Sequence, residues 1–142
     1  MKVRCSVVVL VLMGMLFSAT AHGGESIEYQ LAVINAGGVV PKDDITVARF
    51  RSLLKQLDDT FVEDKQQIAD MAVKARKLLK DEGIDEKLLN IMEGMNKLFS
   101  KPIENQKYAE YSAAYVLLRQ KGMSHAEAFD GLKGILESMG IY

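Results

Sequence analysis

The two histidines and several methionines are the residues of this sequence that could bind a metal ion. If the chain is cleaved after Ala21, His22 becomes the first residue, and its free amine and imidazole could chelate copper together, with His125 as a second imidazole. Copper also accepts thioether sulfur, and three methionines could supply it: Met92, Met95 and Met123. Methionines at helical spacing more often fill a core, so copper binding is an alternative function and we expect no cofactor.

The acidic residues could in principle cleave a glycosidic bond. That reaction needs one protonated and one ionised carboxyl group at a set separation across a cleft. With 19 acidic residues, the sequence cannot single out a pair, although Glu93 stands out because it lies between two methionines. No serine lies in a nucleophile-elbow motif, and Ser124, beside His125, is explained as a helix cap. We therefore expect no catalytic residue and no enzyme, with a small glycan-cleaving enzyme as a further alternative.

A second group of acids surrounds Gly83, in the order Asp81, Glu82, Asp85 and Glu86. A calcium loop needs alternating oxygen ligands over about twelve residues with a closing glutamate. This stretch lacks that spacing, so these acids are expected to be solvated and to cap a helix junction.

Three tyrosines and two arginines are the candidates for an interaction surface. Tyr108, Tyr111 and Tyr115 are three and four residues apart and share one face of a helix. Such a stripe belongs either to the core, with its hydroxyls at the rim, or to an interface, where tyrosine is enriched. If it is an interface, Tyr108 should be the most exposed member. Arg49 and Arg51 are the other side chains expected at this surface.

The first 21 residues match a secretory signal peptide. Lys2 and Arg4 precede an apolar run from Val7 to Phe17, and the small residues of Ala19-Thr20-Ala21 follow. The run is too short for a membrane span, which takes roughly 20 apolar residues. Sec-type export with cleavage after Ala21 is predicted, leading to the periplasm or the medium, with no membrane span once the signal is removed.

The composition of the remaining chain excludes several classes of function. The only cysteine, Cys5, lies within the signal, so disulfides, thiolate catalysis and zinc–cysteine sites are excluded from the mature chain. Without Lys2 and Arg4, 16 basic residues face 19 acidic ones, a net charge of −3. Nucleic-acid binding needs a clustered positive field, and the lysines here alternate with acids, so nucleic acid is not an expected partner.

The apolar residues recur at helical spacing through most of the chain. A short helix is expected over 26–35, although alternation there also fits a strand, and a Gly/Pro loop follows over 36–42. Five further helices are expected: from 44 onward, over 60–83, from Asp85 to about 99, over 104–121 and over 124–140. Capping boxes are expected at the start of the second of these, at Thr60 and Glu63, and at the start of the last, at Ser124 and Glu127.

These elements predict an all-α protein, a compact bundle of four or five antiparallel helices after the signal peptide. The expected organisation is a cleaved signal (1–21), an N-terminal segment with a short helix and a loop (22–43), and a helical bundle domain (44–142). The leading hypothesis for its function is a non-enzymatic exported module that binds a protein partner or a second copy of itself.

Overall fold

The computed structural model describes residues 24–99 and 103–141, so the predicted signal peptide and His22 lie outside the described residues. Over the described ranges it contains six helices and no strand, which confirms the predicted all-α bundle: α1 (Ile27–Ala36), α2 (Ile45–Thr60), α3 (Lys65–Asp81), α4 (Leu88–Asn96), α5 (Tyr108–Gln120) and α6 (His125–Ser138). Five of them lie within 44–142. The short helix α1 packs against α2, α3 and α4, so it is a sixth member of the bundle.

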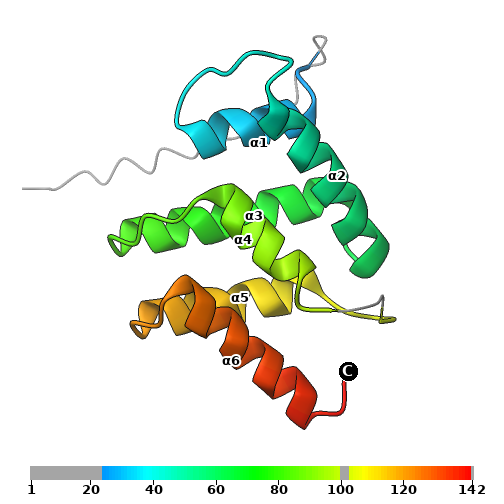
Figure 1. Ribbon diagram of the computed structural model, residues 1–142, viewed down its shortest axis with the longest axis vertical. Helices are drawn as coiled ribbons and strands as arrows, with labels where there is room; N and C mark the ends of the chain where they lie inside the picture. Colours follow the sequence, from blue (N-terminus) through cyan, green and yellow to red (C-terminus); the bar gives the residue numbers. More distant parts are fainter. Residues whose placement is uncertain (1–23, 100–102, 142) are drawn as a thin grey trace, which may run out of the picture.

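The helices form three successive pairs that are stacked along the long axis of the molecule (Figure 1). The first pair is α1 and α2, the second α3 and α4, and the third α5 and α6. Helix α3 is central, because it contacts α1, α2, α4 and α5. Helix α6 packs mainly against α5 and lies at the end of the stack, which leaves open surface between α6 and α4.

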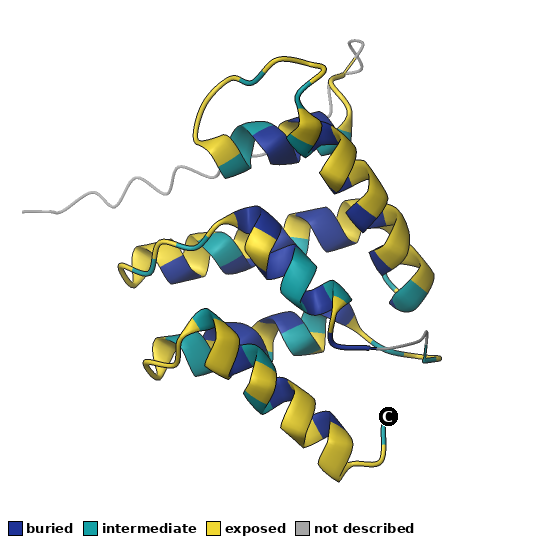
Figure 2. Ribbon diagram, viewed as in Figure 1, coloured by how far each residue is buried: buried dark blue, intermediate teal, exposed yellow. Residues whose placement is uncertain are grey.

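The core runs through all three pairs (Figure 2). Each helix buries one stripe and exposes the other, as its apolar spacing predicts. The largest fully buried side chains come from every helix except α1 and α6 and include Phe50, Leu54, Ile68, Leu88, Met92 and Tyr115. Leu31 and Ala32 of α1 and Leu132 and Leu136 of α6 are also buried, so the outer helices close the two ends of the core.

Four helices begin at a side chain from their own sequence, which we call a local cap. Ser26 caps α1, Asp44 caps α2, and Ser124 with Glu127 forms the predicted capping box of α6. The predicted capping box at Thr60 and Glu63 is wrong. Thr60 is the last residue of α2, and α3 begins at a capping box formed by Asp64 and Gln67. Both pairs have the required spacing, and the second is the one that the structure uses.

The remaining two helices, α4 and α5, have no side-chain cap at their own N-cap residues, Lys87 and Lys107. Asn35, at the end of α1, accepts a hydrogen bond from the Leu89 amide at 2.9 Å. Glu63 accepts hydrogen bonds from the amides of Tyr108 and Ala109 at 2.8 and 3.1 Å. We call these distant caps. They correct the expected starts of α4 at Asp85 and of α5 near residue 104.

None of the helices in the described part of the chain is long and apolar enough to cross a membrane.

Candidate functional site

The tyrosine face of α5 belongs to the core. Tyr108 and Tyr115 are fully buried, and Tyr111 is partly buried. The expectation that Tyr108 is the most exposed tyrosine is therefore wrong. Its ring packs edge-to-face on Phe61, with ring centroids 5.3 Å apart, and its hydroxyl is buried without a hydrogen-bond partner among the described residues. Burial raises the pKa of Tyr108 far above its ordinary value, with a smaller contribution from the charge of Glu63.

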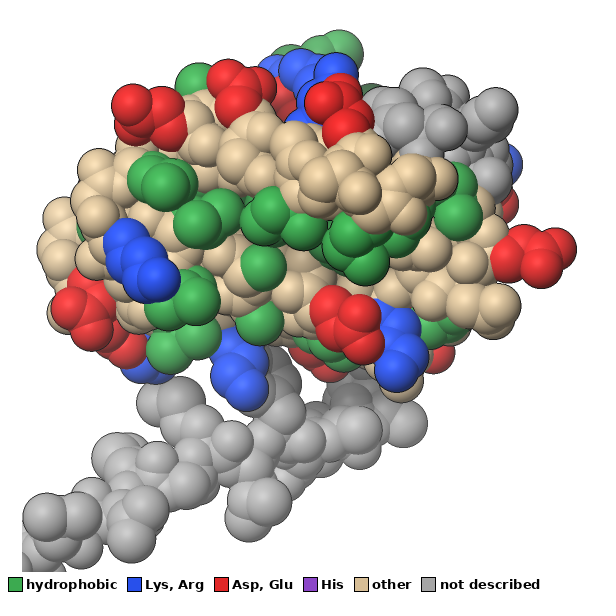
Figure 3. All heavy atoms as spheres, turned by 90° about the horizontal axis from the view of Figure 1, so that it is seen from below, with side chains coloured by type: hydrophobic (Ala, Val, Ile, Leu, Met, Phe, Trp, Pro, Cys, Tyr) green, Lys and Arg blue, Asp and Glu red, His purple; other side chains and the backbone are tan. Residues whose placement is uncertain are grey.

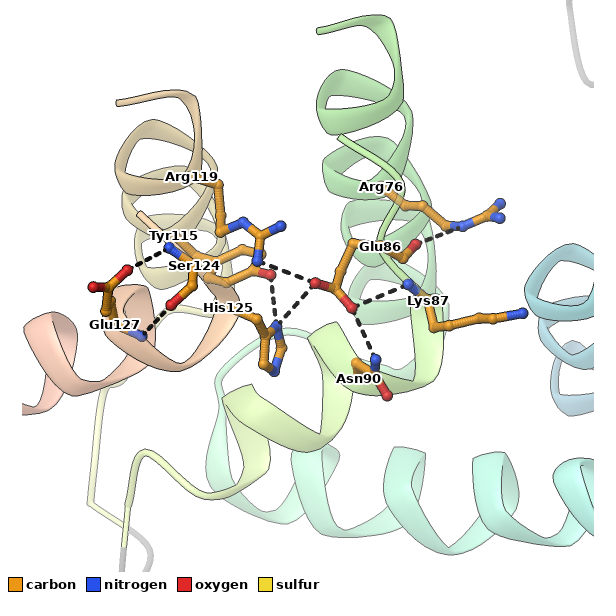
Figure 4. Close-up of polar contacts among 9 residues, drawn as sticks. All are labelled: Arg76, Glu86, Lys87, Asn90, Tyr115, Arg119, Ser124, His125 and Glu127. Atoms are coloured by element: carbon orange, nitrogen blue, oxygen red, sulfur yellow. Dashed lines mark hydrogen bonds and ion pairs between the residues drawn. The ribbon is translucent and has the colours of Figure 1, made fainter. Parts of the chain in front are cut away.

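Tyr115 instead leads to a buried polar cluster that joins three parts of the chain (Figure 4). Its hydroxyl lies 2.8 Å from His125 Nδ1, at the first turn of α6. Glu86, in the loop before α4, places Oε2 3.1 Å from Arg119 Nη1 and 3.4 Å from His125 Nδ1. The Glu86 and Arg119 side chains are each only 10% exposed. The cluster therefore ties the α3–α4 loop to α5 and α6 through a buried ion pair.

The other oxygen of Glu86 binds the start of α4. Oε1 accepts hydrogen bonds from the Lys87 amide at 3.2 Å and from Asn90 Nδ2 at 2.8 Å. The Glu86 carbonyl accepts one from Arg76 Nε of α3 at 3.1 Å. Glu86 thus lies at the helix junction, as expected for this acidic group, but its side chain is largely buried and paired rather than solvated. Nothing in the local sequence marks it, because its partners Arg76 and Arg119 lie 10 and 33 residues away.

The contacts of His125 bear on which ring nitrogen carries the hydrogen. Tyr115 is the nearest neighbour of Nδ1 at 2.8 Å, and Glu86 Oε2 lies 3.4 Å from the same nitrogen. Burial raises the pKa of the Tyr115 hydroxyl, and we assign this hydroxyl as the donor to Nδ1. Burial lowers the pKa of His125, helped by the positive charges of Arg119 and Lys97 and opposed by the negative charge of Glu86. With Tyr115 assigned as the donor to Nδ1, the hydrogen of the neutral ring is on Nε2. Figure 4 shows Nε2 on the side of the ring away from Tyr115 and Glu86.

His125 also lines an open groove between α4 and α6, which we call the α4/α6 groove. It has a volume of about 590 Å³. Its apolar part includes Leu98, Ala126 and Phe129, and its polar part consists of Asn90, Glu93, Lys97, His125, Asp130 and Lys133. The Phe129 ring stacks on Tyr115 at a centroid distance of 4.6 Å.

Gly94 of α4 allows Phe129 to lie in this groove. A Cβ atom at Gly94 would lie 2.1 Å from Phe129 Cε2, well inside van der Waals contact. The close approach of the ring to the α4 backbone therefore requires glycine at this position.

The two predicted arginines and Glu93 lie at the edge of the groove or beyond it. Arg49 of α2 donates a hydrogen bond to Glu93 Oε1, and Arg51 is exposed. Glu93 and Asp130 are two carboxylates that line one groove, the arrangement a glycan-cleaving enzyme would need. Glu93 is already paired with Arg49, so one of these two carboxylates is engaged in an ion pair between α2 and α4.

Of the residues considered for copper, His22 lies outside the described residues and two methionines lie in the core. Met92 and Met95 are fully buried in the core, so their sulfurs cannot reach an open site with His125. Met123 is exposed, and His125 Nδ1 is occupied by Tyr115. Among the described residues, no group of three or more histidine, cysteine or acidic side chains could hold a metal ion. Burial thus removes two of the predicted ligands.

A second, more apolar groove lies between α1 and α3, and we call it the α1/α3 groove. Its volume is about 400 Å³. Five apolar side chains form its floor, two of them fully buried: Ile27, Leu31, Ile34, Ala69 and Val73. Five polar side chains form its rim: Gln30, Gln66, Asp70, Lys74 and Lys77. The sequence pattern did not single out this groove, because it requires α1 to pack beside a helix that follows some 30 residues later.

Comparison with known proteins places the bundle in a family. No curated protein and no solved structure is significantly similar to this chain. One family model matches residues 37–135, which contain α2 to α5 and most of α6, including the whole α4/α6 groove. The match spans well over half of the 142 residues, and the chain belongs to the MoxZ family.

Proposed function

We propose that this protein is an exported, non-enzymatic helical module that binds an amphipathic helix of a partner protein in the α1/α3 groove. The observation that carries the proposal is the shape and lining of this groove. Two helices form its walls, an apolar strip forms its floor, and polar side chains form its rim. Amphipathic helices bind in grooves of this kind through apolar residues at positions i, i+3 or i+4, and i+7.

The length of the groove suits a short helix. Its α3 wall runs from Gln66 to Lys77, which corresponds to about 16 Å of helix at ~1.5 Å per residue. A partner helix of about three turns would cover it. Such a helix would bury the partly exposed side chains of Ile27, Ile34 and Val73, and removing apolar surface from water would drive the binding.

The charges of the rim favour an acidic partner. Lys74 and Lys77 lie at the C-terminal end of the α3 wall, and Asp70 is the one acidic residue of the rim. The Asp70 carboxylate accepts a hydrogen bond from Gln66, and Lys77 is paired with Asp81 at 2.7 Å. A partner helix with a glutamate or aspartate near one end would meet Lys74 and Lys77, which fixes its direction in the groove.

The roles of the polar side chains support a binding function rather than catalysis. Glu86 and Arg119 form a buried structural ion pair, and Glu93 is paired with Arg49. A general acid or base must be free to exchange a proton with a substrate. These carboxylates are instead engaged in ion pairs with arginines, and their contacts join helices.

Export is supported by the sequence pattern of residues 1–21, in which a positive start precedes an apolar run and small residues follow. The proposal places the mature protein, beginning at His22, in the periplasm or the medium. Its partner would then be another exported protein or the external domain of a membrane protein.

The test is photocross-linking in an exporting bacterial host. The photoreactive residue benzoylphenylalanine replaces Gln30 or Gln66 at the rim of the groove, and Gln120 at the exposed end of α5 is the matched control. We expect adducts with the same protein from positions 30 and 66 and not from 120. The adduct protein, once purified, should bind the unmodified chain saturably in calorimetry, and Val73→Glu should abolish this binding.

Adducts of equal yield at all three positions, or binding that Val73→Glu leaves unchanged, would overturn the groove as the binding site. Circular dichroism of the Val73→Glu variant checks that its helices are intact. The mass of the recovered chain tests export separately. A periplasmic species that begins at His22 agrees with the proposal, and an uncleaved cytoplasmic chain contradicts it.

A further inference from the structure

The α4/α6 groove presents a fixed hydrogen-bond donor. The Tyr115 hydroxyl lies 2.8 Å from His125 Nδ1, and with this hydroxyl assigned as the donor, the neutral ring carries its hydrogen on Nε2 and can donate it to a ligand in the groove. The ring also contacts Tyr115 and Phe129, which stack on each other, with centroid distances of 5.7 Å to Tyr115 and 5.0 Å to Phe129. These contacts and the hydrogen bond at Nδ1 hold the orientation of the ring.

A positively charged side chain lines the same groove as this donor. Lys97 and His125 are both lining residues, and the charge of Lys97 acts to lower the pKa of His125, after burial and the charge of Arg119. The groove also includes His125 and Ala126 from the first turn of α6, where the helix dipole adds a partial positive charge. The Nε2 hydrogen, the Lys97 ammonium group and this helix end all belong to one groove and favour an anion there.

The other charged side chains of the groove favour an anion with one negative charge over an anion with two. Asp130 and Glu93 line the groove together with Lys133, and Glu93 is already paired with Arg49. An anion with two negative charges would be repelled by the two carboxylates, whereas a single carboxylate would meet Lys97 and the His125 donor. Next to them, Phe129, Leu98 and Ala126 provide an apolar surface.

From this arrangement we propose that the α4/α6 groove binds a monocarboxylate, with the carboxylate on His125 Nε2 and Lys97 and the apolar body of the ligand against Phe129. The ligand chemistry fits two sources, a small aromatic or aliphatic acid and the C-terminal carboxylate of a peptide. This site is separate from the α1/α3 groove and does not depend on the function proposed for that groove.

The test is an NMR titration of the full mature chain, followed through the ring ¹⁵N signals of His125. Sodium benzoate serves as the small acid and N-acetylphenylalanine as the peptide-like carboxylate, each compared with its uncharged amide. Because a charge-assisted hydrogen bond is about twice as strong as a neutral one, we expect each acid to bind about tenfold more tightly than its amide. The acid that binds more tightly identifies the source of the ligand.

Two variants locate the binding. Lys97→Gln should weaken benzoate binding about tenfold while leaving the helical content unchanged, because Lys97 is exposed. Lys121→Gln, at the exposed end of α5, is the matched control and should bind as the native chain does. Equal affinity for acids and amides, tighter binding of inorganic phosphate than of either acid, or unchanged binding in Lys97→Gln would each overturn the proposal.

Discussion

Helices α4 and α5 begin differently from α1, α2, α3 and α6. The latter four have local caps, in which the N-cap residue and the amide it binds are at most three residues apart. Helices α4 and α5 have distant caps, Asn35 and Glu63, which lie 54 and 45 residues from the amides they bind. A local cap can form in an isolated segment, but a distant cap forms only when the tertiary structure brings the two parts together.

This difference separates the parts of the molecule that are set by local sequence from those that depend on the whole fold. A distant cap acts as both a helix start and a contact between helices, so its loss should reduce the cooperativity of the bundle as well as its stability. The loop of Glu86 extends the same principle, since Glu86 binds the first amide before α4 and also pairs with Arg119 of α5.

The largest effect is expected for Glu86→Ala. This change leaves the Arg119 guanidinium without its charged partner, and the Arg119 side chain is only 10% exposed, so water cannot fully replace that partner. The change also removes the acceptor for the Lys87 amide and the Asn90 side chain. Removing one partner of a buried pair typically costs 3–5 kcal/mol, and we expect a loss of about 3 kcal/mol in the free energy of unfolding, measured by urea denaturation.

Asp81→Ala is the control for Glu86→Ala, because Asp81 forms an exposed pair with Lys77. Such a pair contributes under about 1 kcal/mol. Similar losses for the two variants would show that the pair of Glu86 and Arg119 is not a structural tie between α4 and α5.

The next effect is expected for Glu63→Ala, which removes the distant cap of α5. Two amides at the start of α5 would lose a carboxylate acceptor, and we expect a loss of about 2 kcal/mol, at the upper end of what a helix cap contributes. Glu63→Gln keeps an acceptor oxygen and should lose less. Glu104→Ala, in the exposed loop before α5, should cost almost nothing, and a loss as large as that of Glu63→Ala would contradict the cap.

The local caps also explain how much of the fold could be predicted from the sequence. The apolar spacing indicated six helical segments, and Ser26, Asp44 and Ser124 lie at or beside the predicted starts of α1, α2 and α6. The signals failed where two patterns overlapped. Thr60 and Glu63 have capping-box spacing, but the structure uses Asp64 and Gln67, and Glu63 turns to α5 instead.

The candidate site was predictable only in part. His125 was singled out by its rarity, since the sequence contains two histidines, but its neighbours Tyr115 and Glu86 were assigned to other roles. Their proximity depends on the stacking of the second and third helix pairs (Figure 1).

Figure 3 shows apolar side chains gathered in a band across the face seen from below, at the α5 and α6 end. Helical spacing alone does not indicate which of the apolar residues remain exposed there.

A smaller effect is expected for Asn35→Ala, which removes the single hydrogen bond from Leu89 to the distant cap of α4. The loss should be about 1 kcal/mol, as for a typical cap. Asn35→Asp keeps the acceptor and adds a negative charge that is favoured at the start of α4 and disfavoured at the C-terminal end of α1, so it should lose less stability than Asn35→Ala. Equal destabilisation by both changes would show that Asn35 acts through packing and not as a cap.

The smallest effect concerns pH and His125, which belongs to the locally capped α6 but contacts the Glu86 cluster. Burial lowers the pKa of His125 in the folded chain below its ordinary value of 6.5, with Arg119 and Lys97 acting in the same direction and Glu86 against it. The unfolded chain therefore binds a proton on this ring at higher pH than the folded chain does. The stability associated with the neutral ring is present above pH 6.5 and is lost as the pH falls through the lowered pKa of the folded state.

We expect the native chain to lose more stability between pH 7.5 and 5 than His125→Gln does in parallel urea denaturation. Parallel pH profiles would show that the proton affinity of His125 is the same in the folded and unfolded chains.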